Sequence, residues 1–77
     1  MKDLIEFVVK ALVDEPSEVQ INEVDRDKVV LYELRVSKKD IGKIIGKRGR
    51  TALAIRTILN AVSTKQGKRA ELEILEQ

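Results

Sequence analysis

Two glycines three positions apart, Gly46 and Gly49, interrupt an apolar helical pattern and restrict the possible fold more than any other feature of the chain. Because glycine lacks a Cβ, it reaches backbone conformations that other residues avoid, so a Gly-x-x-Gly segment can turn sharply between two helices. The segment before the turn carries Ile41, Ile44 and Ile45 on one side of a short predicted helix. The segment after it predicts a longer helix with apolar residues at i, i+3, i+4 and i+7, namely Ile55, Ile58, Leu59 and Val62.

The residues before this pair of helices predict one more helix and two strands. Residues 2–13 place apolar side chains near helical spacing, and Pro16 prevents that helix from continuing. Residues 18–24 and the run that begins near residue 29 alternate apolar and polar side chains, and the polar stretch 25–27 predicts a tight turn between two strands. The apolar face expected for the helix consists of Leu4, Ile5, Val8 and Leu12, and that of the second, central strand consists of Val30, Tyr32, Leu34 and Val36.

Two further signals complete the predicted order of elements. Ser37 and Asp40 have the spacing of a capping box, so their side chains are expected to bind free amides at the start of the short helix. Gly67 ends the long helix, and the segment after it alternates apolar residues with glutamates as a last strand would. The order is α-β-β-α-α-β, which predicts an α+β fold with a three-stranded sheet covered on one face by three helices. At 77 residues the chain can bury one modest core, so residues 1–77 are expected to form a single domain.

Composition excludes several classes of function. The chain has no Cys and no His, which removes thiol chemistry, the usual zinc sites and the commonest general base near neutral pH. A phosphate-binding loop of nucleotide hydrolases is also excluded, because three residues instead of four separate Gly42 from Gly46, and Arg48 replaces the magnesium-binding hydroxyl. No stretch approaches the roughly 20 apolar residues of a membrane span, and Asp3 and Glu6 stand where a signal peptide would be basic and then apolar. The sequence therefore predicts a cytoplasmic protein that is not an enzyme and needs no metal or cofactor.

Positive charge is concentrated in one segment of the chain. Residues 38–69 hold ten Lys and Arg against a single Asp, a net charge of +9, although the whole chain carries only +2. A local field of one sign is expected where a polyanion binds, but a solvated basic face that only keeps the protein in solution would give the same count. The arrangement around the two glycines has to distinguish these readings.

The Gly46-Lys47-Arg48-Gly49 turn favours a polyanion. A sugar-phosphate strand can approach a backbone that carries no side chains at two positions, and the amides from about Gly49 to Ala52 are expected to be free donors at the positive end of a helix dipole. Isoleucines beside the turn could form one wall of an apolar groove for bases, opposite an edge strand, although core packing is the alternative for each of them. The candidate binding residues are Gly46, Lys47, Arg48, Gly49, Lys43, Arg50, Ile41, Ile44 and Ile45.

The segment IGKIIGKRGRTALAIR, residues 41–56, closely resembles the signature of the KH family of RNA-binding domains, an I-I-G-x-x-G segment between two helices. A leading helix and strand before this core is similar to the type II arrangement of bacterial KH domains, and the small size is similar to that of stand-alone bacterial KH proteins. The resemblance implies that the chain binds single-stranded RNA, acts as an RNA chaperone or post-transcriptional regulator, and has links to cell shape. It also implies a homodimer, or a heterodimer with a larger KH-containing protein.

A small RNA-associated domain could instead have another RNA-binding fold, or it could act mainly as an adaptor. An RNA-recognition motif or cold-shock fold would display aromatic side chains on its sheet, whereas Phe7 and Tyr32 are the only aromatic residues here and both are expected in the core. A dimerising adaptor with weak RNA contact of its own remains open, because a single KH domain binds only about four nucleotides.

Overall fold

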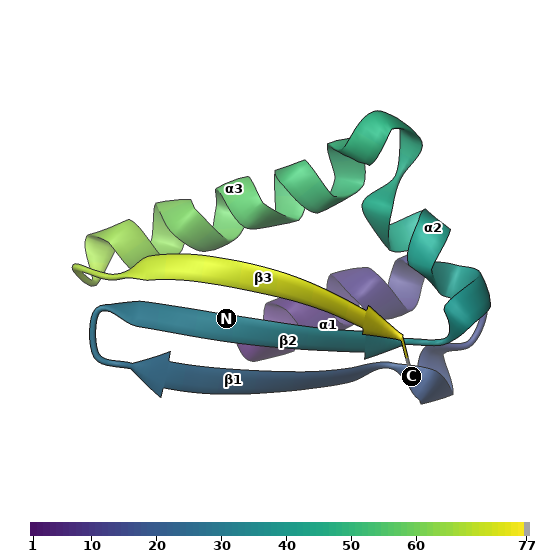
Figure 1. Ribbon diagram of the computed structural model, residues 1–77, viewed down its shortest axis with the longest axis horizontal. Coiled ribbons are helices and arrows are strands. Elements are labelled where there is room, and N and C mark those ends of the chain that lie inside the picture. The colour runs from purple at the N-terminus through teal and green to yellow at the C-terminus, as the bar shows by residue number, and fades with distance from the viewer. Residues whose placement is uncertain (77) are drawn as a thin grey trace.

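A computed structural model describes residues 1–76 and confirms the predicted order of elements (Figure 1). Short 3₁₀ turns at residues 16–18, 38–40 and 47–49 connect the longer elements. The helices and strands are α1 (Lys2–Leu12), β1 (Gln20–Arg26), β2 (Val29–Val36), α2 (Ile41–Ile45), α3 (Arg50–Lys65) and β3 (Arg69–Glu76).

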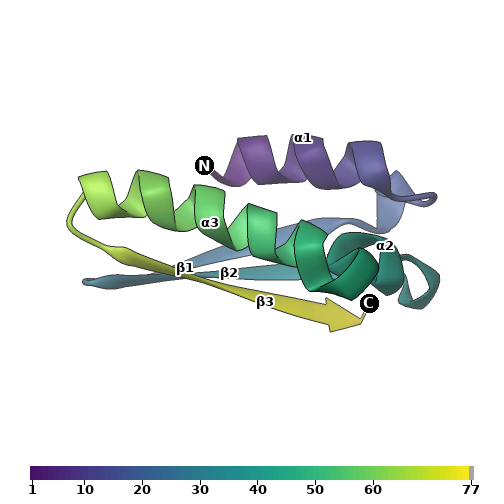
Figure 2. The ribbon, with the colours of Figure 1, turned by 90° about the horizontal axis from the view of Figure 1, so that it is seen from above.

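The three strands form one mixed sheet with β2 in the centre, as predicted. β1 runs antiparallel to β2 and is joined to it by a tight turn in which Arg26 pairs with Val29. β3 runs parallel to β2, so the chain must cross from one end of the sheet to the other, and α2 and α3 make that crossing. All three helices lie on one face of the sheet (Figure 2).

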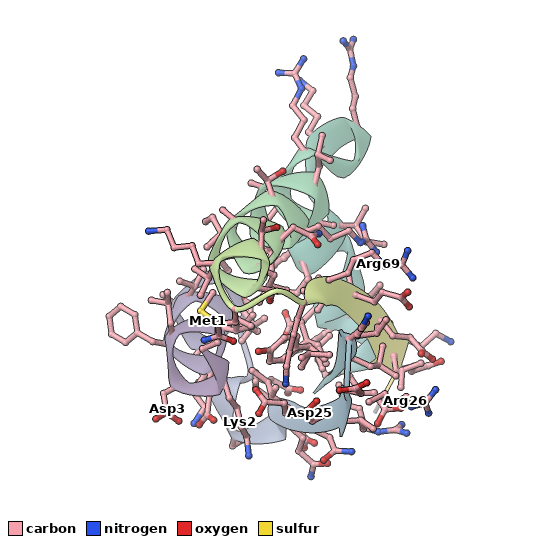
Figure 3. All side chains as sticks on the ribbon, turned by 90° about the vertical axis from the view of Figure 1, so that its left-hand side faces the viewer. Met1, Lys2, Asp3, Asp25, Arg26 and Arg69 are labelled. Atoms are coloured by element: carbon pink, nitrogen blue, oxygen red, sulfur yellow. The ribbon has the colours of Figure 1, made fainter. Side chains whose placement is uncertain are left out.

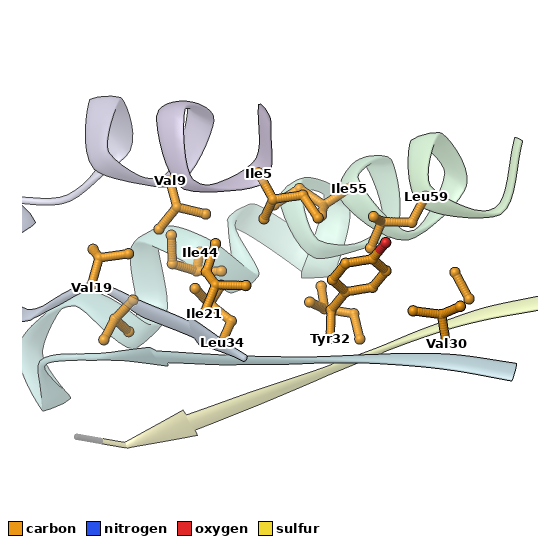
Figure 4. Close-up of a cluster of buried hydrophobic side chains, with 13 residues drawn as sticks. Ile5, Val9, Val19, Ile21, Val30, Tyr32, Leu34, Ile44, Ile55 and Leu59 are labelled. Atoms are coloured by element: carbon orange, nitrogen blue, oxygen red, sulfur yellow. The ribbon is translucent and has the colours of Figure 1, made fainter. Parts of the chain in front are cut away.

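The alternation in β2 correctly predicts the core face of the sheet. Its even-numbered side chains from Val30 to Val36 are buried, while the side chains between them lie on the face without helices. These buried side chains pack against α1, α2 and α3 in a single core (Figure 4). The members of the core are Ile5, Val9, Val19, Ile21, Val30, Tyr32, Leu34, Val36, Ile44, Ile55, Leu59, Ala70 and Leu72.

The face expected for α1 is correct at Ile5 and wrong at Leu4, Val8 and Leu12. The structure buries Ile5 and Val9, leaves Leu4 half exposed, and exposes 73% of Phe7, which was expected in the core. Apolar side chains cover most of the circumference of this helix, so periodicity could not identify the face that packs. The same holds in part for α3, where Ile58 was expected on the buried stripe but is 52% exposed.

The predicted capping box also has a different role. The Asp40 carboxylate is completely buried and accepts hydrogen bonds from the backbone amides of Asp14 and Glu15, each at 3.1 Å, and from the Ser37 hydroxyl at 3.1 Å. The two amides belong to the segment that follows α1, not to the helix start, where no side-chain cap is present. Asp40 therefore fastens the end of α1 to the beginning of α2. Burial alone would raise the pKa of Asp40, but the hydrogen bonds from Asp14, Glu15 and Ser37 outweigh burial, so the net pKa is lowered.

The buried carboxylate predicts a pH-dependent loss of stability in Asp40→Asn. The amide keeps the shape of the side chain but presents an NH₂ group to a backbone N–H, so we expect the melting temperature at pH 7 to fall by about 4–8 °C or more. Because the pKa of Asp40 is lower in the folded chain, its stabilising effect is present above the ordinary value of 3.8 and is lost as the pH falls through the folded value. Thermal unfolding followed by circular dichroism between pH 7 and pH 2.5 should show the two proteins converging below about pH 4.

Asp27→Asn is the matched control for this experiment. Asp27 lies in the β1–β2 turn with a positive φ of 63°, a conformation that Asn adopts equally well. The control should melt within about 2 °C of the original chain at pH 7. An equal loss in both variants would contradict a special role for Asp40.

Candidate nucleic-acid interface

The turn between α2 and α3 is built by three residues with positive φ. Gly46 ends α2 at φ 76° and ψ 174°, a region open only to glycine, and its amide donates to the Gly42 carbonyl at 2.9 Å. Arg48 and Gly49 follow in the left-handed region at φ 58° and φ 72°. The result is a compact loop between two helix ends, in which Gly46 and Gly49 are half-buried.

The two glycines of the turn are needed for different reasons. A Cβ at Gly46 would lie 2.6 Å from the Cβ and 2.9 Å from the backbone nitrogen of Thr51, and would also collide with the Thr51 hydroxyl. A Cβ at Gly49 would meet nothing within 4 Å. Gly46 is therefore required by space and by conformation, whereas Gly49 is required by conformation alone.

Free positive charge gathers at this turn. Lys47, Arg48 and Arg50 are exposed, line a polar hollow of about 180 Å³, and form no ion pair with any of residues 1–76. Figure 3 shows nitrogen-tipped side chains that project into solvent from the loop between α2 and α3, at the top of that view. These three cations are available to a ligand without breaking an existing pair.

Lys43, the fourth basic candidate, is in a different state. Its Nζ lies 2.8 Å from Oδ2 of Asp14. One turn earlier, Lys39 lies 3.2 Å from the Glu15 carboxylate, which raises the pKa of this lysine. Asp14 and Glu15 therefore belong to the candidate site. The sequence did not predict this, because they stand 29 and 24 positions before their lysine partners with no local pattern to connect them.

The three isoleucines of α2 are divided between the core and the surface. Ile44 is completely buried and cannot touch a ligand, so its expected place in a groove wall is wrong: at that position the alternative of core packing holds. Ile41 is half-buried against the core, and Ile45 is 41% exposed. Ile45 is therefore the isoleucine that offers apolar surface beside the turn.

The edge of the sheet nearest to the turn is β3, which packs against both α2 and α3. Arg56 of α3 reaches across and donates from Nη2 to the backbone carbonyl of Leu72 at 3.4 Å. Beyond Leu72, Ile74 on the same face of β3 is half-buried. An aliphatic surface thus continues from α2 toward the end of the edge strand.

The number of backbone amides open to an anion is smaller than expected. The Gly49 amide donates to the Gly46 carbonyl at 3.1 Å, and the Arg50 amide donates to the Lys47 carbonyl. Of the four amides expected to be free, this leaves only those of Thr51 and Ala52 as candidates, in the first turn of α3. The 16-residue α3 directs its positive dipole end at the same point.

Membrane and metal sites are not found in the part of the chain that the structure describes. None of its helices is long and apolar enough to cross a bilayer. Within residues 1–76, no group of three or more carboxylates is arranged to hold a metal ion.

The sequence of residues 2–74 matches the family described as KhpA/KhpB, KH domain. The chain belongs to the KhpA/KhpB family of KH domains. RNA-binding protein KhpA of Borreliella burgdorferi is 54% identical over 74 residues, which cover 96% of this chain and 90% of that protein. The proteins of the same name from Chlamydia pneumoniae and Aquifex aeolicus are 51% and 50% identical and cover 100% and 99% of this chain.

Membership of the KhpA/KhpB family confirms three of the expectations drawn from the sequence. The resemblance to KH domains is correct, and the α+β order with a three-stranded mixed sheet agrees with the type II KH fold. The relatives are named RNA-binding proteins, which agrees with the expectation that the chain is not an enzyme.

Unequal roles for the two glycines of the KH turn predict unequal costs of substitution. Gly46→Ala should lower the free energy of unfolding by roughly 2–4 kcal/mol, since the Cβ both strains the backbone and collides with Thr51. Gly49→Ala should cost only about 1–2 kcal/mol, the ordinary penalty of a left-handed residue. Urea unfolding of both variants measures the difference.

Gly67→Ala is the control for conformational strain alone. Gly67 has a φ of 71° and open space around its Cβ position, at the far end of α3. It should behave like Gly49→Ala. If Gly46→Ala were no more costly than Gly67→Ala, the contact with Thr51 would not be a constraint.

Proposed function

We propose that this chain binds single-stranded RNA, with the Gly46–Gly49 turn as a clamp for the RNA backbone. One observation carries the proposal: the turn has two glycines, which leave its backbone open to a ligand, and the same turn carries three unpaired cations. These cations are Lys47, Arg48 and Arg50. The names of the relatives, RNA-binding protein KhpA, support it. The role we propose is that of a cytoplasmic RNA chaperone or post-transcriptional regulator.

Binding would proceed through the phosphates first. Lys47, Arg48 and Arg50 attract the strand, and a phosphate then approaches the turn and the first amides of α3, Thr51 and Ala52, where the helix dipole favours negative charge. Unstacked bases would lie on the aliphatic surface of Ile45 and along the edge strand β3. These contacts fix the backbone more than they identify bases, so we expect weak sequence preference.

Reversal of the charges in the turn should abolish this binding. In the variant with Lys47→Asp and Arg48→Asp, we expect the affinity for a ten-nucleotide uridine RNA at about 50 mM salt to fall about 30-fold or more. The fold should persist, because both side chains are exposed and Asp accepts the left-handed conformation at position 48. Fluorescence anisotropy measures the affinity, and circular dichroism the fold.

A variant with Lys2→Asp and Lys28→Asp carries the same change of net charge at exposed positions in α1 and the β1–β2 turn. Its affinity for the same RNA should fall by less than about fivefold. A salt titration of the original chain should give a slope of about −2, near −0.7 for each of three neutralised phosphates. A folded turn variant that still binds RNA as the original does would rule out the proposed site.

A second candidate function is assembly through the outer surface of the helices. Between α1 and α3 lies an apolar groove of about 100 Å³, and Phe7 projects from α1 with 73% of its surface exposed. An apolar groove beside exposed apolar side chains often marks a contact with another protein, so a partner with a matching apolar face is favoured. The groove is lined by Met1, Leu4, Ile5, Val8, Ile55, Ile58 and Leu59.

We propose that the partner is another KH domain of the same family, in a second copy of this chain or in a larger KH-containing protein. α1 carries both a projecting aromatic ring and one wall of an apolar groove, and such a pair can be self-complementary, as a two-fold interface between like domains requires. The family description covers both KhpA and KhpB with one KH domain, which supports either partner.

Replacement of Phe7 should separate assembly from RNA contact. Because Phe7 is exposed, Phe7→Glu should leave the fold intact and reduce the mass in sedimentation equilibrium from that of a dimer to that of a monomer. Binding to a four-nucleotide RNA should not change, whereas binding to a 20-nucleotide RNA should weaken about 10-fold or more, since two linked sites bind more tightly than one.

Val24→Glu is the control on the opposite face of the sheet, where no helix packs. It should leave the mass unchanged. A monomer for the original chain at every concentration would contradict self-association and leave the larger KH-containing protein as the partner to test by mixing.

A further inference from the structure

The basic surface around the turn consists of two halves in different electrostatic states. On the side of α3, Lys47, Arg48 and Arg50 have no carboxylate partner within residues 1–76. On the side of α2, Lys43 is paired with Asp14 at 2.8 Å and Lys39 with Glu15 at 3.2 Å. The net charge of the segment conceals this asymmetry.

The backbone of the two acidic residues on the α2 side is held in place by the fold. The backbone amides of Asp14 and Glu15 donate to the buried Asp40 carboxylate at 3.1 Å each, at the start of α2. The side chains of Asp14 and Glu15 are 60% and 44% exposed, and they reach Lys43 and Lys39 respectively. The backbone that carries the two acids cannot move away from α2 unless the Asp40 hydrogen bonds break.

We propose that Asp14 and Glu15 form an electrostatic barrier that closes the α2 side of the clamp and confines RNA phosphates to the side of Lys47, Arg48 and Arg50. The inference rests on the proposed RNA clamp and adds the path of the strand to it. A phosphate that approached Lys43 would have to displace the Asp14 carboxylate or lie beside it. The two acids thereby limit the affinity for RNA, and they leave the side of Lys47, Arg48 and Arg50 as the path of the strand past the turn.

The size of the barrier follows from Coulomb's law. A carboxylate about 5 Å from a phosphate in a solvent-exposed site weakens binding about 2- to 4-fold, after screening by about 0.1 M salt. Two carboxylates together therefore weaken binding about 5- to 15-fold. Removal of the acids also frees two lysines for phosphates, which should make the salt slope steeper by about 1.4.

The test is the variant with Asp14→Asn and Glu15→Gln, whose backbone amides still bind Asp40. We expect it to bind a ten-nucleotide uridine RNA about 5- to 15-fold more tightly than the original chain and to show the steeper salt slope. In the same background, Lys39→Gln with Lys43→Gln should return both the affinity and the slope to their original values. That fourfold variant has the net charge of the original chain, so a change of total charge would give the same return; a control with the charge of the Asp14→Asn, Glu15→Gln variant is needed to separate the freed lysines from total charge.

The matched control is Asp25→Asn with Glu71→Gln. These carboxylates also pair with cations, Asp25 with Lys68 at 2.8 Å and Glu71 with Arg69 at 3.1 Å. Figure 3 shows Asp25 and Arg69 at the end of the sheet that faces the viewer, which is the end away from α2 in Figure 1. The control has the same change of net charge, and its affinity should stay within about twofold of the original.

The outcomes separate the barrier from the clamp. Suppose that the original chain binds RNA through Lys47 and Arg48, but the Asp14→Asn, Glu15→Gln variant gains no more affinity for RNA than the control does. The proposed barrier is then wrong and the proposed clamp stands. If that variant gains affinity even when Lys47 and Arg48 are replaced by Asp, the clamp is wrong and RNA binds along α2. If neither the original chain nor the variant binds RNA, both are wrong.

Discussion

The buried carboxylate of Asp40 is the contact on which the rest of the site depends. It brings together the end of α1, the 3₁₀ turn after β2 and the start of α2, through hydrogen bonds to Asp14, Glu15 and Ser37. A five-residue helix such as α2 has almost no stability of its own. Its position comes from Asp40 at one end, Ile44 in the core and the glycine turn at the other end. The same carboxylate fixes the two acids that pair with Lys39 and Lys43.

The turn itself combines strain with exposure. Arg48 is held in the left-handed region, where a residue with a side chain costs about 1–2 kcal/mol, although Gly or Asn would fit there at less cost. A strained cation at an exposed turn is the pattern expected when function outweighs local stability. Gly46 differs, because its missing Cβ is what allows Thr51 and the first turn of α3 to come close. The backbone of the turn and the amides of α3 are thereby brought to one place.

The sequence was sufficient for the elements and their order, and insufficient for contacts between distant segments. The two-residue period of β2 selects the correct face, because the charged residues Glu33 and Arg35 alternate with apolar ones in its second half. In α1 the same reasoning failed in part, since apolar residues cover most of the circumference and only docking decides that Val9 is buried and Phe7 is exposed. Asp40 was identified as a capping residue from its local spacing, and its true partners lie 25 and 26 positions away. The Gly-x-x-Gly turn was located correctly because its geometry is local, whereas the pairing of Lys43 depends on the tertiary structure.

The long helix α3 connects the two surfaces that the chain presents to others. Its first turn completes the proposed phosphate site, and its middle carries Ile58 on the apolar groove shared with α1. A second KH domain docked in this groove would therefore be joined to the clamp by one rigid helix, so the two clamps of a pair would keep a fixed spacing. Because each clamp binds only about four nucleotides, affinity for a longer strand would come mainly from this fixed spacing, through the high effective concentration of the second site. Asp14 and Glu15 act in the same direction, since they keep each single clamp weak and so make binding depend on the pair.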